Sequence, residues 1–207
     1  MLWKKKRVMP QWEHIGEYYR GKRVYLLNGF IDHEYKLRGV DIPRFDRKDN
    51  VWAVNGLWAL VPQVSLGFEM HDLGGPSYDA LGGMKDFYIE DALKNAKIPV
   101  FMPREVPGFV NVLEYPLSRV MKYHGLRAPY FGESLNYCIA FAAMFGVREL
   151  VLITGNYPKE VAGERASTEF WCGVAKGRGI RLTKEGNLFR ADKWEDFYKP
   201  NQYGYRV

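Results

Sequence analysis

The chain has little cysteine and no long apolar run. Its 207 residues include two cysteines, Cys138 and Cys172. Both lie in apolar helical patterns, so we expect two buried thiols rather than a disulfide or a metal-binding pair. No stretch of about 18 apolar residues is present, so we expect no membrane-spanning helix. The basic residues near the N-terminus lack the apolar segment of a secretion signal, and we therefore expect a cytoplasmic protein.

Several motifs of well-known enzyme classes are also missing. No GxGxxG follows the first apolar strand pattern and no GxxxxGK[ST] occurs, which disfavours NAD-type Rossmann binding and P-loop kinase chemistry. The chain has no GxSxG elbow, which disfavours a hydrolase. HExxH is absent and no second histidine lies within ligand spacing of His71, so we expect neither a metal nor a cofactor.

The net charge is positive, with 30 lysines and arginines against 24 acidic residues and a formal charge of +6. This balance favours anionic partners, which include nucleotides, nucleic acids and anionic glycans. The basic residues cluster only at residues 4–7, which we interpret first as a solvated terminal segment and second as a nucleic-acid arm. We expect any DNA binding to be weak and salt-sensitive.

The stretch from Ser134 to Lys159 is the most informative part of the chain. A serine that could cap a helix precedes about three turns that are apolar on nearly every side, and Gly146 ends them. A β-branched run from Arg148 to Gly155 follows directly, which predicts one helix–strand unit of a parallel sheet. The N-terminus of such a buried helix presents free backbone N–H groups, which suit a phosphate.

Apolar runs alternate with helical patterns along most of the chain, and 47% of the residues are hydrophobic. Strands are predicted within 22–30, 50–58, 64–72, 98–102, 148–155 and 180–183, and helices at 86–96, 116–124, 134–145 and 164–176. The alternation predicts an α/β fold, a single Rossmann-like domain with a mostly parallel central sheet flanked by helices. We divide the chain into a basic N-terminal segment (1–21), a Rossmann-like nucleotide-binding domain (22–184) and a C-terminal extension packed on it (185–207).

Three predicted strands end in small or polar residues. These are Asn28 and Gly29, Asn55 and Gly56, and the group Glu69, His71 and Asp72. Since ligands of open parallel sheets bind outside the carboxyl ends of the strands, we expect these residues to share one cleft. For His71 we leave two interpretations open, a cleft residue that contacts sugar or nucleotide hydroxyls and a hydrogen-bonded structural histidine.

Two further residues have both a structural and a functional interpretation. His124 ends a helix before Gly125, where it could interact with the helix dipole or act as a general base. Trp171 belongs to a helix with small residues, and we favour close packing of this helix over stacking of the indole on a base or sugar ring.

Four short motifs in chain order resemble the sialyltransferase-like glycosyltransferases of bacterial lipooligosaccharide synthesis (glycosyltransferase family 42) and a related uncharacterised group with phage members. They are the Leu27-Asn28-Gly29 turn, the Ala53-Val54-Asn55 strand end, His124 ahead of Ser134-Leu135-Asn136-Tyr137, and the FGVREL run that leads to Gly155 and Asn156. Together they cover roughly residues 22 to 160.

The resemblance implies a Rossmann-like fold and metal-independent transfer of a sugar from a nucleotide-sugar. It implies that Asn28 and Asn55 touch the nucleotide, that Ser134 and the N–H groups after it, including Asn136, hold the phosphate, and that His124 is the base. It also places Gly155 and Asn156 at the nucleotide. Phe30 and Ile31 replace the Pro-Ser of the family, and Tyr157 stands at its aspartate position, so the resemblance does not fix the donor.

From the sequence we expect a glycosyltransferase that uses a nucleotide-sugar as substrate. Two alternatives stay open. One is a protein that binds a nucleotide without turnover, such as a phage accessory or anti-defence protein. The other is a DNA-associated protein that uses its positive charge and its aromatic residues.

Overall fold

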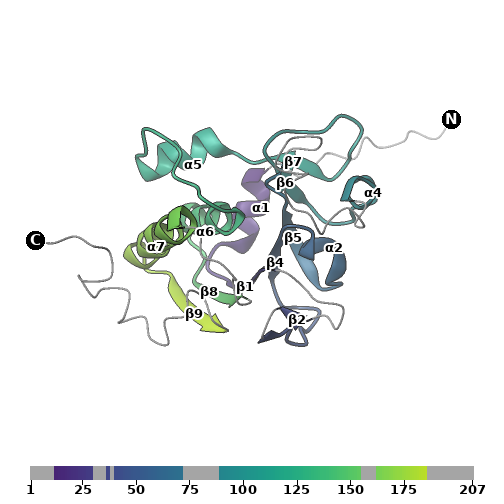
Figure 1. The fold of residues 1–207 in the computed structure, drawn as a ribbon, viewed down its shortest axis with the longest axis horizontal. Coiled ribbons are helices and arrows are strands. Elements are labelled where there is room, and N and C mark those ends of the chain that lie inside the picture. The colour runs from purple at the N-terminus through teal and green to yellow at the C-terminus, as the bar shows by residue number, and fades with distance from the viewer. Residues whose placement is uncertain (1–11, 30–35, 38–39, 72–88, 155–161, 186–207) are drawn as a thin grey trace, which may run out of the picture.

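The computed structural model describes residues 12–29, 36–37, 40–71, 89–154 and 162–185 (Figure 1). These residues form an α/β fold around one seven-stranded sheet, and every strand pair in it is parallel. A second, two-stranded antiparallel sheet is formed by β2 (Lys36–Leu37) and β3 (Val40–Asp41). The Rossmann-like architecture predicted from the alternation of apolar runs is confirmed.

The strands of the main sheet are short and mostly buried. They are β1 (Arg23–Asn28), β4 (Val51–Val54), β5 (Val64–Phe68), β6 (Val100–Met102), β7 (Val112–Glu114), β8 (Glu149–Thr154) and β9 (Arg181–Glu185). The helices are α1 (Trp12–Tyr19), α2 (Leu57–Leu60), α4 (Ile89–Lys94), α5 (Leu117–His124), α6 (Ser134–Phe145) and α7 (Ala162–Gly177). The six strands predicted for the sheet all form.

Besides β2 and β3, three elements have weaker sequence signals and were not predicted. β7 has only three residues, and α2 is a single turn. α1 lies within the segment 1–21 that we had assigned as N-terminal, and its Ile15 and Tyr19 belong to the hydrophobic core. Gly16 allows α1 to approach α6 closely, because a Cβ atom at this position would lie 2.3 Å from the ring of Phe145. A tertiary contact, rather than local periodicity, stabilises this helix.

Helices cover both faces of the sheet (Figure 1). α1, α5, α6 and α7 pack on one face, where their side chains join residues such as Leu26 and Leu152. α2 and α4 pack on the other face, against neighbours of opposite parity such as Leu27 and Ile153. Side chains alternate along a strand, so residues separated by an even number of positions, which we describe as having the same parity, contact the same helical layer.

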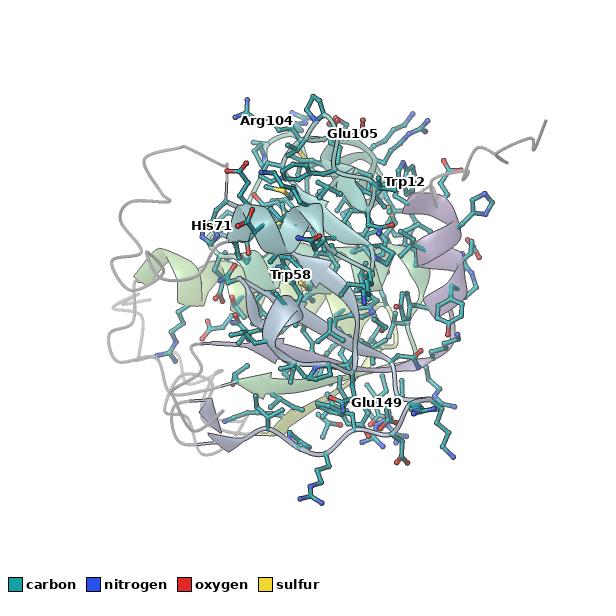
Figure 2. The ribbon with its side chains drawn as sticks, turned by 90° about the vertical axis from the view of Figure 1, so that its right-hand side faces the viewer. Trp12, Trp58, His71, Arg104, Glu105 and Glu149 are labelled. Atoms are coloured by element: carbon teal, nitrogen blue, oxygen red, sulfur yellow. The ribbon has the colours of Figure 1, made fainter. Side chains whose placement is uncertain are left out.

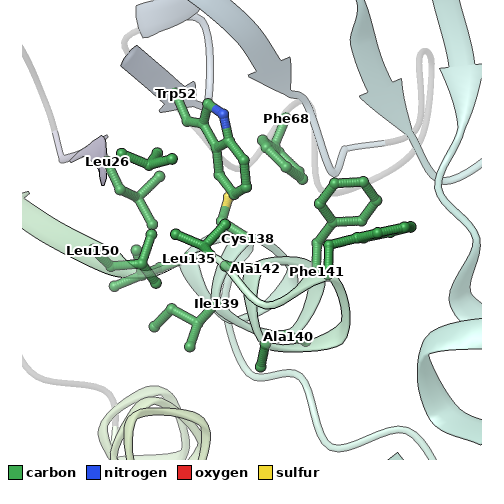
Figure 3. Close-up of a cluster of buried hydrophobic side chains, with 14 of the residues drawn as sticks. Leu26, Trp52, Phe68, Leu135, Cys138, Ile139, Ala140, Phe141, Ala142 and Leu150 are labelled. Carbon is green, nitrogen blue, oxygen red and sulfur yellow. The ribbon is translucent and has the colours of Figure 1, made fainter. Parts of the chain in front are cut away.

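α6 fills the centre of the first layer. Its side chains are buried on nearly every side, and Phe141 and Cys138 lie against Trp52 and Phe68 of the sheet (Figure 3). Gly146 ends the helix in the left-handed region at φ 67°, as predicted. Both cysteines are unpaired and buried, which confirms the expectation of two thiols. Burial raises the pKa of Cys172 to about 12.

The strand order is β7-β6-β5-β4-β1-β8-β9. From β1 the chain adds strands outward through β4, β5, β6 and β7, and then returns to place β8 on the opposite side of β1. The order therefore reverses between β1 and β8. In open parallel sheets this reversal leaves a crevice between the loops that leave the two strands in opposite directions. No helix in the described residues is long and apolar enough to cross a membrane.

Candidate functional site

Asn28 and Thr154 are the last residues of β1 and β8, the two strands at the reversal of strand order. They lie side by side as the final pair of the β1–β8 register. Both are buried. The Thr154 hydroxyl has no hydrogen-bond partner in the part of the chain that the structure describes. A buried polar atom of this kind costs free energy unless a ligand or water satisfies it.

The side chains of this pair face α6 and α7. Asn28 has the parity of Leu26, and Thr154 that of Leu152, both of which contact the α6 layer. A hydrogen bond of 3.4 Å from Asn28 Nδ2 to Glu133 Oε2 agrees with this placement. The reversal point therefore presents an amide, a hydroxyl and a carboxylate together.

Glu133 connects the sheet edge to α7. Its carboxylate also accepts a hydrogen bond from the hydroxyl of Thr168. Because a carboxylate can only accept, the Thr168 oxygen is left to accept from the amide of Asn136 at 2.7 Å. The Asn136 oxygen then faces the Ser167 hydroxyl and the backbone N–H groups of Gly132 and Glu133. Asn136 is fully buried and hydrogen-bonded, so it holds the start of α6 against α7.

The prediction that Ser134 caps this helix is wrong. The N-cap residue is Glu133, in extended conformation at φ −153°, and Ser134 is the first helical residue. Neither residue caps the helix through its side chain, since that of Glu133 turns toward Asn28 and Thr168. A carboxylate at the positive end of the helix dipole is favourable for the protein. Ser134 itself is buried, with 8% of its surface exposed.

A second polar cluster lies at the end of β5, on the face covered by α2 and α4. Glu69 is buried, with 2% of its surface exposed. One carboxylate oxygen lies 2.6 Å from His71 Nδ1, and the other accepts from the indole N–H of Trp58 at 3.4 Å. Two N–H donors therefore compensate the buried carboxylate. Of the predicted group at this strand end, Glu69 and His71 contact each other.

Asn55 lies beside this cluster, at the end of β4. Its backbone is in the left-handed region at φ 50°, and Gly56 follows at φ 74°. The predicted Asn-Gly turn is present, and it leads straight into α2. The backbone N–H of Asn55 donates to Phe68, while its side-chain oxygen is buried without a partner in the described structure. Gly29 also has positive φ, at 123°, directly after β1.

His124 is the last residue of α5, as predicted, and its ring packs against two helices. Its Nε2 lies 3.0 Å from the carbonyl of Ala140 in α6, and its ring meets that of Trp171 at 5.0 Å. Because the carbonyl can only accept, Nε2 carries the proton, and the lone pair belongs to Nδ1, which is buried without a partner. Burial lowers the pKa of His124. This geometry supports the structural interpretation, and the general-base role of His124 stays a prediction.

Trp171 is completely buried. Its indole N–H donates to the carbonyl of Tyr130, and its ring stacks on Phe131. These contacts agree with the packing interpretation that the sequence favoured. Three predicted site residues, Asp72, Gly155 and Asn156, lie outside the described residues.

The sequence did not single out Thr154, Glu133, Thr168 or Trp58. A polar residue at the end of an apolar strand could have indicated Thr154, as it did Asn28. Glu133 and Thr168 come together only because α6 and α7 pack side by side, and no local pattern signals that contact. In the described part of the chain no group of three potential ligands could hold a metal ion.

The fold and the residues at its edge define a doubly wound α/β protein with two polar clusters at the carboxyl ends of its strands. No family model, no curated protein and no solved structure matches the chain.

Proposed function

We propose that the chain binds a nucleotide or nucleotide-sugar at the carboxyl edge between β1 and β8, and transfers the sugar to an acceptor hydroxyl without a metal. One observation carries the proposal, the buried Asn28–Thr154 pair at the reversal of strand order. This is the position at which doubly wound sheets bind nucleotides. The unpartnered Thr154 hydroxyl supports a ligand that offers a hydrogen bond there.

The chemistry of the cluster suits the hydroxyl groups of a ribose or sugar. Carboxylate, amide and hydroxyl oxygens accept hydrogen bonds from such groups, as the carboxylate of an acidic residue does from ribose in dinucleotide-binding sheets. Glu133 and Asn28 supply these atoms. The positive charge of the whole chain, +6, favours approach of an anionic ligand.

Thermal unfolding with a panel of nucleoside monophosphates and UDP-, GDP- and CMP-sugars tests the binding step. A ligand at 100 times its dissociation constant stabilises the fold by about 2.7 kcal/mol, which raises the midpoint measurably. Asn28→Ala should reduce this shift. Asn50→Ala is the matched control, because Asn50 precedes β4 at the opposite end of the same sheet and donates to the carbonyl of Arg23.

Binding that Asn50→Ala weakens as much as Asn28→Ala would contradict the proposed site. If no nucleotide of the panel shifts the midpoint, the proposed function itself is wrong. Binding without release of nucleotide from any donor, in the presence or absence of simple sugar acceptors, would identify a nucleotide-binding protein without transferase activity.

A further inference from the structure

The Glu69–His71 pair has the geometry of a proton-accepting unit. The imidazole Nδ1 lies 2.6 Å from the carboxylate of Glu69. Since the carboxylate can only accept, Nδ1 carries the proton of the neutral ring and Nε2 keeps its lone pair. A carboxylate that fixes the tautomer of a histidine in this way leaves the opposite nitrogen ready to accept a proton from a hydroxyl group.

The surroundings hold the carboxylate rigidly. Glu69 is 2% exposed, and its second oxygen accepts from the indole of Trp58. Gly67 allows this arrangement, because a Cβ atom at that position would lie 2.8 Å from the Trp58 ring. Gly67 and Glu69 have the same parity along β5, so the indole crosses the strand at Gly67 and reaches the carboxylate one step further along the same face.

The histidine, in contrast, reaches the surface. Its side chain is 18% exposed, and Figure 2 shows it near the margin of the described ribbon. The structure gives His71 Nε2 no hydrogen bond within the residues it describes. A histidine with one nitrogen fixed by a buried carboxylate and the other open to the surface differs from His124, whose lone pair is buried.

We propose that His71, rather than His124, is the general base of the transfer reaction, with Glu69 as its positioning residue. This inference rests on the proposed function. β5 is two strands from β1, about 10 Å at the usual strand spacing, so a donor bound at Asn28 on the α6 face would place its sugar near His71 if the sugar extends over the carboxyl end of β4 to the α2 face. Asn55, at the end of β4, lies between the two positions and has an unpartnered side-chain oxygen.

The proposed step is a displacement at the anomeric carbon of the sugar. The acceptor O–H gives its proton to His71 Nε2 while the oxygen attacks the anomeric carbon of the sugar. The bond from that carbon to the phosphate oxygen breaks, and the nucleotide leaves with the bonding electron pair. The imidazolium then returns the proton to solvent. Glu69 stabilises the imidazolium through Nδ1–H and does not itself bind a proton.

Nucleotide release from the same UDP-, GDP- and CMP-sugar panel tests the role of His71. His71→Gln should reduce kcat by at least about 100-fold, while the thermal shift caused by the nucleotide stays unchanged. His14→Gln is the matched control, since His14 lies exposed on α1 and should not affect turnover. Equal turnover by wild type and His71→Gln would overturn the proposal, as would a wild type that binds nucleotides and turns over none of the panel.

The tautomer of the His71 ring tests the role of Glu69 without an activity assay. Long-range ¹H–¹⁵N spectra of the ligand-free protein, assigned with His71→Gln, should show the neutral ring protonated at Nδ1. Glu69→Gln should change the tautomer population and lower kcat with little change in KM. A neutral ring protonated at Nε2 in the wild type would overturn the role of Glu69. A wild-type protein that binds no nucleotide of the panel would instead contradict the proposed function. Failure of the His71 proposal can therefore be distinguished from failure of the proposed function.

Discussion

Asn28 and Thr154 form the last register pair of β1 and β8, and both side chains point into the layer of α6 and α7. This pair joins the two halves of the doubly wound sheet at its carboxyl edge. Asn28 has a partner in Glu133, whereas the Thr154 hydroxyl has none in the described structure. The difference makes Thr154 the sharper probe of the proposed site.

Thr154→Val should stabilise the ligand-free protein and weaken nucleotide binding. Valine has nearly the shape of threonine, and removal of a buried hydroxyl without a partner should raise the free energy of unfolding by about 1 kcal/mol. The same change removes the hydrogen bond that we propose for the ligand. Urea unfolding and the nucleotide-induced thermal shift measure the two effects. A destabilised variant would show that the hydroxyl has a partner within the protein.

Thr168→Val should destabilise the protein by about 1 to 3 kcal/mol, because Asn136 loses a buried partner and Glu133 loses a donor. The control is Thr183→Val. The Thr183 hydroxyl donates to the Glu149 carboxylate at 3.2 Å. When this hydroxyl is removed, Glu149 still has its ion pair with Arg23 at 3.6 Å. Urea unfolding should therefore show a smaller loss for Thr183→Val, and equal losses would contradict the network around Asn136.

His124 should make the stability depend on pH. Burial lowers its folded pKa below the ordinary value of 6.5, so the unfolded chain binds more protons in the window between the two values. The free energy of unfolding should therefore fall as the pH drops through this window. His124→Gln should remove this part of the dependence, which urea unfolding at a series of pH values from 6.5 downward measures. A slope that His124→Gln leaves unchanged would contradict the assignment.

Two glycine substitutions should have opposite effects. Gly16→Ala places a Cβ atom 2.3 Å from the ring of Phe145, so it should separate α1 from α6 and cost about 1 to 3 kcal/mol. Gly173 lies exposed within α7, and a Cβ atom there meets nothing within 4 Å. Gly173→Ala should stabilise the protein by about 0.5 to 1 kcal/mol through helix propensity. Urea unfolding of both variants measures the contrast, and destabilisation by both would contradict it.

The proposed site and the proposed base lie on opposite faces of one sheet edge. Asn28 and Thr154 face α6 and α7, whereas Glu69 lies against Trp58 of α2. The sequence predicted that all the strand ends would share one cleft. The structure places the strand ends at one edge but divides their side chains between the two helical layers, because residue parity decides which layer each side chain contacts.

The sequence alone determined the α/β class, the six predicted strands and the central helix. Continuous apolar runs such as Leu150–Ile153 form buried parallel strands, and Gly146 ends α6 because a left-handed residue is needed there. These features depend on local composition, which a single sequence contains. The apolar patterns around Cys138 and Cys172 likewise indicated two buried, unpaired thiols.

Only the tertiary structure decided which polar residues meet. Glu133 reaches Asn28 and Thr168 across separations of 105 and 35 residues, and no local pattern contains such a contact. The same holds for His124, whose lone pair is buried because α5 packs on α6 and α7. Side-chain partners at this range depend on how the layers pack and on the parity of each residue, so the fold was predictable from the sequence while the chemistry of its edge was not.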